Sequence, residues 1–78
     1  MFNQRLRSVR MSHKITQQAM ADMLSISLNA YQKYEQAERM PSLNRLVQIA
    51  DFLDVSTDYL LGRDEWLQSH EVSFDGFR

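Results

Sequence analysis

The sequence of 78 residues contains no cysteine, one proline and two glycines. The lack of cysteine excludes a disulfide framework and a thiolate zinc site, and the shortage of proline and glycine excludes collagenous or flexible chains. No run of 18 apolar residues is present that could cross a membrane. With 44% hydrophobic and 24% charged residues, the chain is expected to form one soluble, cytoplasmic, mostly helical domain, stabilised by its own core or by a second copy.

Side chains suited to catalysis are also scarce. The two histidines, His13 and His70, have no HExxH pattern or cysteine partner, and two glycines cannot build a phosphate-cradling loop. His13 is most simply a surface residue in the first turn between helices, and His70 a residue of the tail. We therefore expect a protein that is not an enzyme and that needs no cofactor or metal.

Charge is unevenly distributed along the chain, although the net charge is only −1. Residues 1–45 carry seven lysines and arginines against three acidic residues, a net charge of +4. Residues 46–78 carry two basic residues against seven acidic ones, a net charge of −5. This asymmetry indicates a basic face that could meet phosphates and an acidic back, the alternative being two merely solvated surfaces.

Apolar spacing predicts three helices in the first half of the chain. The first runs from Asn3 to about Met11, with Phe2, Leu6 and Val9 as its buried stripe. Thr16 can cap a second helix that ends near residue 24, and Ser27 can cap a third. The residues expected to share the inner faces of these two helices are Ala19, Met20, Met23 and Leu24, and then Ala30, Tyr31 and Tyr34.

Two further helices are predicted after the only proline, Pro41. Ser42 can cap the first of them, which ends at Asp54, and Ser56 can cap a short last helix that Gly62 is placed to end. The longer helix has the strongest amphipathic pattern in the chain, and its apolar face is expected to hold Leu43, Leu46, Val47, Ala50 and Leu53. The predicted fold is therefore all-α, with five helices between residues 3 and 62.

The tail, residues 63–78, has no clear helical period. It carries several bulky apolar side chains, including Trp66, Leu67 and Phe74. Such side chains either fold back onto the domain or pack against a second subunit, since aromatic residues are favoured anchors of interfaces. The pattern leaves both arrangements open.

Residues 16–35, with the sequence TQQAMADMLSISLNAYQKYE, resemble the helix-turn-helix of the Cro/C1-type repressors, the XRE family. Residues 41–43 (PSL) and 55–62 (VSTDYLLG) are also similar to that family, so the likeness covers residues 3–62. A lone helix-turn-helix would be weak evidence, because two short helices joined by a small turn are common. The resemblance implies a compact, lambda-repressor-like DNA-binding domain over residues 1–62, followed by a tail that is a candidate dimerisation segment.

Three residues depart from the family pattern. Ser25, Ala37 and Asp54 stand where the family often has glycine. Each is unfavourable if the backbone needs a positive φ there, least so for aspartate. These departures bear on turn geometry more than on function.

In this family the second helix of the motif enters the major groove, where every base pair shows a different pattern of donors and acceptors. With the two tyrosines inward, the outward residues are Leu28, Asn29, Gln32, Lys33 and Gln36. The resemblance assigns base contacts to Leu28, Asn29 and Lys33, with Gln32 close by. The amides suit adenine, the lysine suits guanine and the leucine can contact a thymine methyl group.

Phosphate contacts are expected around that helix, because they fix its register on the duplex. The helix N-termini at Thr16, Gln17 and Ser42 offer backbone amides and the positive end of the helix dipole. The remaining predicted phosphate contacts are Lys14, Gln36 and Arg39.

Arg10 and Glu35 stand at two positions that commonly form an ion pair in this family. The resemblance therefore gives them a structural role, which is to orient the recognition helix. Gln17 can brace the same helix in addition to facing a phosphate.

One domain of this size spans few base pairs, so the resemblance implies a homodimer on a near-palindromic operator with half-sites about 34 to 36 Å apart. The candidate dimer contacts are Leu60, Trp66, Leu67 and Phe74. The expected function is transcriptional regulation, most simply repression, on double-stranded DNA and without a membrane or small-molecule ligand. Regulation would then act through concentration, turnover or a protein partner such as an antirepressor or a toxin.

The sequence leaves several roles open within this class, namely a phage or prophage repressor, a restriction-modification controller, an antitoxin or a host regulator. The alternative outside it is a protein-interaction adaptor that keeps the fold without reading DNA, since a fold does not fix a function. The two classes differ in whether the outward face of the third helix is needed for binding.

Overall fold

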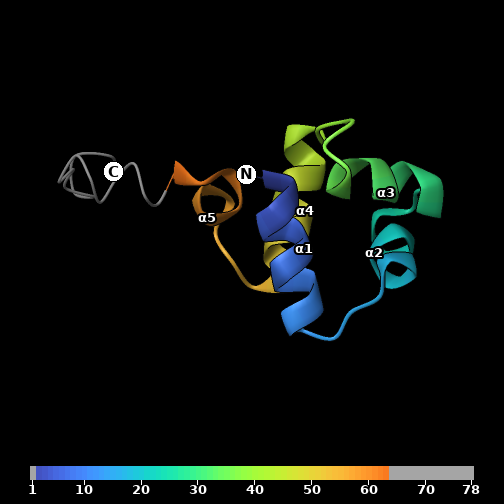
Figure 1. Ribbon diagram of the computed structural model, residues 1–78, viewed down its shortest axis with the longest axis horizontal. Coiled ribbons are helices and arrows are strands. Elements are labelled where there is room, and N and C mark those ends of the chain that lie inside the picture. Colours follow the sequence, from blue (N-terminus) through green and yellow to red (C-terminus); the bar gives the residue numbers. More distant parts are fainter. Residues whose placement is uncertain (1, 64–78) are drawn as a thin grey trace, which may run out of the picture.

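The computed structural model describes residues 2–63. Over this range the chain forms five helices and no strand, which confirms the predicted all-α fold (Figure 1). The helices are α1 (Phe2–Ser12), α2 (Gln17–Leu24), α3 (Leu28–Glu35), α4 (Leu43–Leu53) and α5 (Thr57–Leu61). None of them is both long and apolar enough to span a membrane.

A hydroxyl side chain begins each of the last four helices, as the sequence predicts. Each hydroxyl oxygen accepts a hydrogen bond from the backbone N–H three residues further along, at 3.0 to 3.3 Å. This bond satisfies one of the backbone donors that a helix start leaves unpaired. The four N-cap residues are Thr16, Ser27, Ser42 and Ser56.

Left-handed residues end three of the helices. Ser25 and Asp54 follow α2 and α4 with φ of 57° and 56°, and Gly62 follows α5 with φ of 78°. Ala37, in the turn after α3, has φ of 62°. The three positions at which the chain departs from the family glycine therefore do require positive φ. Lys14, for which the sequence predicted no unusual backbone conformation, is a fourth non-glycine residue with positive φ.

The core joins all five helices. Its buried apolar residues are Phe2, Leu6, Val9, Met20, Ala21, Leu24, Tyr31, Tyr34, Leu46, Ile49, Ala50, Leu53 and Leu60. The prediction that Leu43 and Val47 of α4 face the core is wrong, because Leu43 is 75% exposed and Val47 is 42% exposed. The buried stripe instead includes Ile49, since a helix of about 3.6 residues per turn places it between Leu46 and Leu53.

Smaller corrections apply to α2 and α3. Ala19 is exposed rather than part of the inner face, and Ala30 is only half-buried. Ala21, also in α2, is fully buried. A methyl side chain at this position lets neighbouring helices approach closely, and α2 contacts both α3 and α4.

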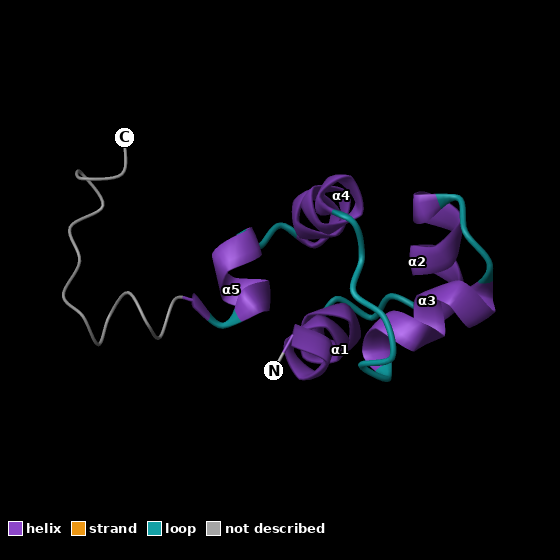
Figure 2. Ribbon diagram, turned by 90° about the horizontal axis from the view of Figure 1, so that it is seen from above, coloured by secondary structure: helices purple, strands orange, loops and turns teal. Residues whose placement is uncertain are grey.

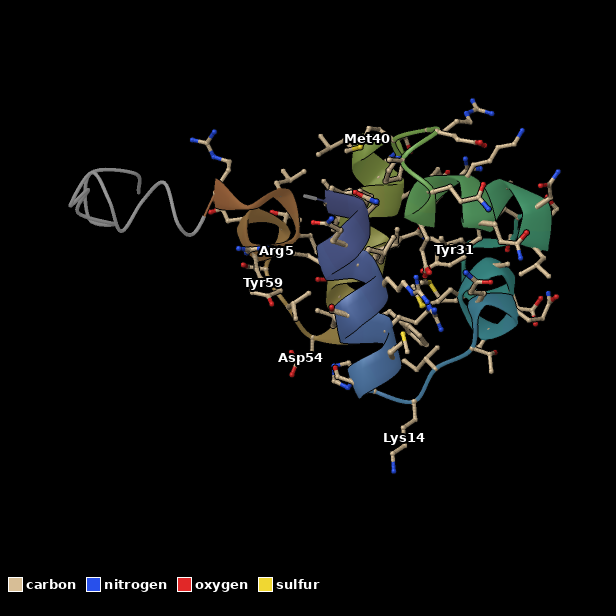
Figure 3. The ribbon with its side chains drawn as sticks, viewed as in Figure 1. Arg5, Lys14, Tyr31, Met40, Asp54 and Tyr59 are labelled. Carbon is tan, nitrogen blue, oxygen red and sulfur yellow. The ribbon has the colours of Figure 1, made fainter. Side chains whose placement is uncertain are left out.

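The helix-turn-helix and the last helix lie at opposite ends of the molecule. Figures 1 and 2 both show α2 and α3 on one side of α1 and α4, with α5 on the other. Arg5 ties α5 to α1, because its guanidinium lies 4.6 Å from the centre of the Tyr59 ring and donates a hydrogen bond of 2.8 Å to the Tyr59 carbonyl (Figure 3). Helix α3 is therefore remote from the end of the molecule at which α5 lies.

One predicted dimer contact needs correction on this basis. Leu60 is 0% exposed and belongs to the core of this chain, so it has no surface left for a second subunit. The other three candidates, Trp66, Leu67 and Phe74, lie outside the described residues, as does His70.

Candidate nucleic-acid interface

A buried ion pair fixes the end of α3 against α1. Arg10 donates hydrogen bonds from Nε and Nη2 to the two carboxylate oxygens of Glu35, at 2.6 and 3.2 Å. Each residue is only 9% exposed. A two-point bond between a guanidinium and a carboxylate restricts orientation as well as distance. The structure thus brings together the two residues to which the family resemblance gave a structural role.

Two more side chains donate to the same carboxylate. Gln17, the first residue of α2, donates from Nε2 to Oε1 at 3.1 Å, and Tyr31 donates its hydroxyl to Oε2. Arg10 also reaches the Ile15 carbonyl at 2.8 Å. The Glu35 carboxylate is therefore a common acceptor for α1, α2 and α3, and among the described residues no buried side-chain nitrogen or oxygen lacks a partner.

These contacts shift the pKa values of all three ionisable groups. Burial alone would raise the pKa of Glu35, but the hydrogen bonds from Arg10, Tyr31 and Gln17 and the charge of Arg10 hold it below its ordinary value. The same bonding raises the pKa of Arg10. Burial and the adjoining carboxylate raise the pKa of Tyr31. Glu35 is accordingly an ionised acceptor, and Tyr31 and Arg10 remain donors, at neutral pH.

Two tyrosines set the rotation of α3. Tyr31 and Tyr34 are both buried and pack edge to face, with ring centres 6.1 Å apart and an interplanar angle of 81°. Figure 3 shows Tyr31 directed from α3 toward the centre of the molecule. The opposite face of the helix carries the exposed Asn29 and the half-buried Lys33, as predicted for outward residues.

Gln32 lies between the outward and buried faces of α3. It is half-buried, and its Nε2 donates to the Oε1 of Gln17 at 3.2 Å. Leu28, one turn earlier on the same helix, is half-buried too. Of the four predicted base-contacting residues, Gln32 is thus the one whose amide is already engaged by another side chain of the protein. The sequence gave no sign of this bond.

The predicted phosphate contacts lie on several segments around α3. Lys14, on the turn between α1 and α2, points away from the protein (Figure 3). Gln36 directly follows α3, Arg39 lies in the loop before α4, and all three are exposed. The exposed hydroxyls of Thr16 and Ser42 serve as N-caps, so a ligand there would meet the adjacent backbone amides.

A hollow of about 350 Å³ lies next to the ion pair. Its lining residues are Arg7, Arg10, Gln17, Glu35 and Gln36. Two arginines against one carboxylate give it an excess of positive charge. Sequence reasoning missed Arg7, although its spacing of three residues from Arg10 on one helix was a signal that could have found it.

The comparisons with known proteins agree on one family. Residues 6–60 match the family model described as helix-turn-helix, HTH_3. The chain is 33% identical over 91 residues to the uncharacterized HTH-type transcriptional regulator YobD of Bacillus subtilis. This match covers all of this chain and 81% of YobD. It is 47% identical over 60 residues to the cryptic phage CTXphi transcriptional repressor RstR of Vibrio cholerae, covering 77% of this chain and 54% of RstR.

Several relatives are longer than this chain. The chain spans about half the length of RstR and of the HTH-type regulator YqaE of Bacillus subtilis, to which it is 48% identical over 61 residues, or 78% of this chain. Among solved structures, that of a transcriptional regulator from Listeria innocua has a TM-score of 0.73 at 20% identity and covers 99% of this chain and 82% of that one. This likeness supports the fold.

Proposed function

This chain belongs to the helix-turn-helix family, and we propose that it is a transcriptional regulator which binds double-stranded DNA in a sequence-specific way through α3. The observation that carries the proposal is the orientation of α3. Its tyrosines are buried, its end is held by the ion pair of Arg10 and Glu35, and its opposite face offers polar side chains. A rigid helix with an accessible polar face suits the major groove.

The proposed base contacts come from Leu28, Asn29, Gln32 and Lys33. An amide can pair with adenine N6 and N7, and a lysine can donate to guanine O6 and N7. Asn29 and Lys33 lie on the accessible face of α3, one turn apart. These two side chains are therefore proposed as the main readers of the sequence.

The proposed phosphate contacts surround that helix. They are Lys14, Thr16, Gln17, Gln36, Arg39 and Ser42, and the hollow beside the ion pair adds Arg7. Contacts of this kind fix register and make affinity depend on salt without carrying sequence information. A low net charge does not prevent this dependence, because the slope follows the number of phosphates contacted.

We further propose a homodimer on a near-palindromic operator, acting as a repressor in the cytoplasm. One domain reads few base pairs, and two copies about one DNA turn apart supply the missing affinity and specificity. The relative RstR is named as a phage repressor, and this name is what favours repression, with a prophage as the first place to look for the operator. Antirepressors and toxins are the classes of protein partner to test.

The testing experiment is selection of bound duplexes from a random library, at two salt concentrations. Wild type is compared with Asn29→Ala and with Gln48→Ala, an exposed amide of α4 outside the proposed interface. We expect wild type and Gln48→Ala to enrich the same two-fold symmetric site, and Asn29→Ala to lose preference within each half-site by about tenfold. A folded wild type that enriches no sequence would overturn the proposal and redirect the search to a protein partner.

A further inference from the structure

A chain of hydrogen bonds runs from the buried ion pair to the recognition surface. Arg10 donates to Glu35, Gln17 donates to Glu35 at 3.1 Å, and Gln32 donates to Gln17 at 3.2 Å. The first links are buried or part-buried, and the last side chain stands on the rim of the outward face of α3. The buried ion pair is therefore connected through Gln17 to a side chain at the edge of the outward face of α3.

The direction of each bond in this chain is determined by the first. An ionised carboxylate can only accept hydrogen bonds, so Gln17 must turn its NH₂ group toward Glu35. The Gln17 carbonyl oxygen then faces the other way, where it can only accept. Gln32 must in turn present its NH₂ group to Gln17, as the structure shows.

This fixes which groups of Gln32 remain for a ligand. One N–H of its NH₂ group is used by Gln17. When that N–H is the one trans to the carbonyl oxygen, the oxygen and the second N–H are left side by side, and this arrangement is part of the proposal below. A glutamine amide with no such partner can turn over by 180° and exchange its oxygen and nitrogen, because the two ends have nearly the same shape. Gln17 removes that freedom.

We propose that Gln32 is a specificity-determining residue, held by Gln17 so that it accepts at one edge and donates at the next, which selects adenine over guanine in the major groove. Adenine offers the N6 amino group and the N7 acceptor side by side, matching this pair, whereas guanine places its O6 acceptor where the Gln32 oxygen would lie. The inference rests on the proposed function. Gln17 acts here as a positioning residue, in addition to any phosphate contact.

A purely structural role for the amide chain predicts something different. In that case, loss of Gln17 or Gln32 changes stability, and affinity changes by the same factor for every sequence. A phosphate contact made by Gln17 alone also changes affinity uniformly and lowers the salt slope. Only a positioning role for Gln17 changes the ratio of the affinities for duplexes that carry adenine or guanine at one base pair.

The experiment uses the full chain and duplexes carrying the selected operator, with each purine position changed in turn between adenine and guanine. Binding is titrated for wild type, Gln32→Met, Gln17→Met, the double variant and Gln17→Ala. Gln18→Met is the matched control, because Gln18 is the exposed neighbour of Gln17 in the same helix. Thermal melting of each variant identifies losses that come from unfolding.

We expect Gln32→Met and Gln17→Met to lower the adenine preference about tenfold at the same base pair in each half-site, since a specific pairing of this kind discriminates by about that factor. The double variant should lose no more than either single one, and Gln18→Met should match wild type. Gln17→Ala should give the same result as Gln17→Met, because both remove the amide and only methionine could disturb packing with a longer side chain.

Two results would overturn the inference. One is a preference that survives in Gln32→Met, and the other is a loss of affinity in both Gln17 variants that is equal for adenine and guanine duplexes. Failure of the proposed function looks different, because wild type would then show no preference at any position and Asn29→Ala would change nothing. An operator whose specificity depends on Asn29 but not on Gln32 contradicts the inference alone.

Discussion

At the scale of single residues, Glu35 is the side chain on which the orientation of α3 depends. It accepts hydrogen bonds from Arg10, Gln17 and Tyr31, which come from three different helices. A buried carboxylate is costly unless it is paired and fully bonded, and here both conditions are met. The energetic consequence appears when one partner is removed.

We predict that Arg10→Met destabilises the domain by about 3 to 5 kcal/mol, because it leaves the Glu35 carboxylate buried without a cation. Arg7→Met is the matched control, since Arg7 is an exposed arginine one turn earlier in the same helix, and it should change stability by less than about 0.5 kcal/mol. Urea unfolding at neutral pH measures both. Equal, small effects of the two substitutions would contradict a structural role for the ion pair.

The family resemblance predicted the pairing of Arg10 with Glu35, whereas the hydrogen bond between Gln32 and Gln17 could not be predicted from the sequence. Fifteen positions separate the two glutamines, and they meet only because α2 and α3 cross at one particular angle. Glutamine has several rotatable bonds, so its partner depends on the surrounding packing. The same holds for Arg7, whose place beside the ion pair is a matter of helix arrangement.

At the scale of secondary-structure elements, helix starts are well specified and helix ends are strained. The four predicted hydroxyl caps all accept the expected backbone bond. The turns, in contrast, place Lys14, Ser25, Ala37 and Asp54 at positive φ. A side chain with a Cβ atom is unfavourable in that region, most clearly for alanine, which has no polar group to bond locally.

We predict that Ala37→Gly stabilises the protein by about 0.5 to 1 kcal/mol, since glycine adopts the observed φ of 62° without steric cost. The matched control is Ala19→Gly, the same chemical change at an exposed position inside α2, which should destabilise by about 0.5 to 1 kcal/mol. Thermal melting followed by circular dichroism compares the two. Destabilisation by both substitutions would show that strain in this turn is negligible.

The amphipathic pattern of α4 predicted most of its buried face, and the error lies at one edge of that face. Leu43 and Val47 are apolar and lie at helical spacing, yet both are exposed, while Ile49 is buried. All of these positions fit the period of a helix, and α4 lies against α2 and α5. Periodicity finds a helix and its approximate inner face, and the neighbouring helices decide which edge of that face is covered.

At the scale of the whole molecule, the proposed reading surface and the C-terminal end of the domain are far apart. Helix α3 lies at one end, and α5, tied to α1 through Arg5 and Tyr59, lies at the other (Figures 1 and 2). This separation supports the proposal that the dimer contacts and the DNA contacts use different surfaces. The predicted tail contacts at Trp66, Leu67 and Phe74 remain predictions.

We predict that a chain ending at residue 63 stays folded but loses self-association. The buried core of the described range runs from Phe2 to Leu60, so removal of residues 64–78 leaves it complete. Sedimentation and binding to an operator with one or two half-sites compare this chain with the full one and with Trp66→Ala. Unchanged dimerisation of the shortened chain would place the interface on the folded domain itself.

The sequence alone determined the number and type of the helices, their four hydroxyl caps and the family, because these depend on local hydrogen bonding and on a spacing of residues within one helix. Resemblance added the pairing of Arg10 with Glu35. Only the tertiary structure decided that Leu60 is core, that Leu43 and Val47 are exposed, and that Gln17 holds Gln32. Those outcomes depend on how the helices cross, which is a property of residues distant in the chain and not of any local pattern.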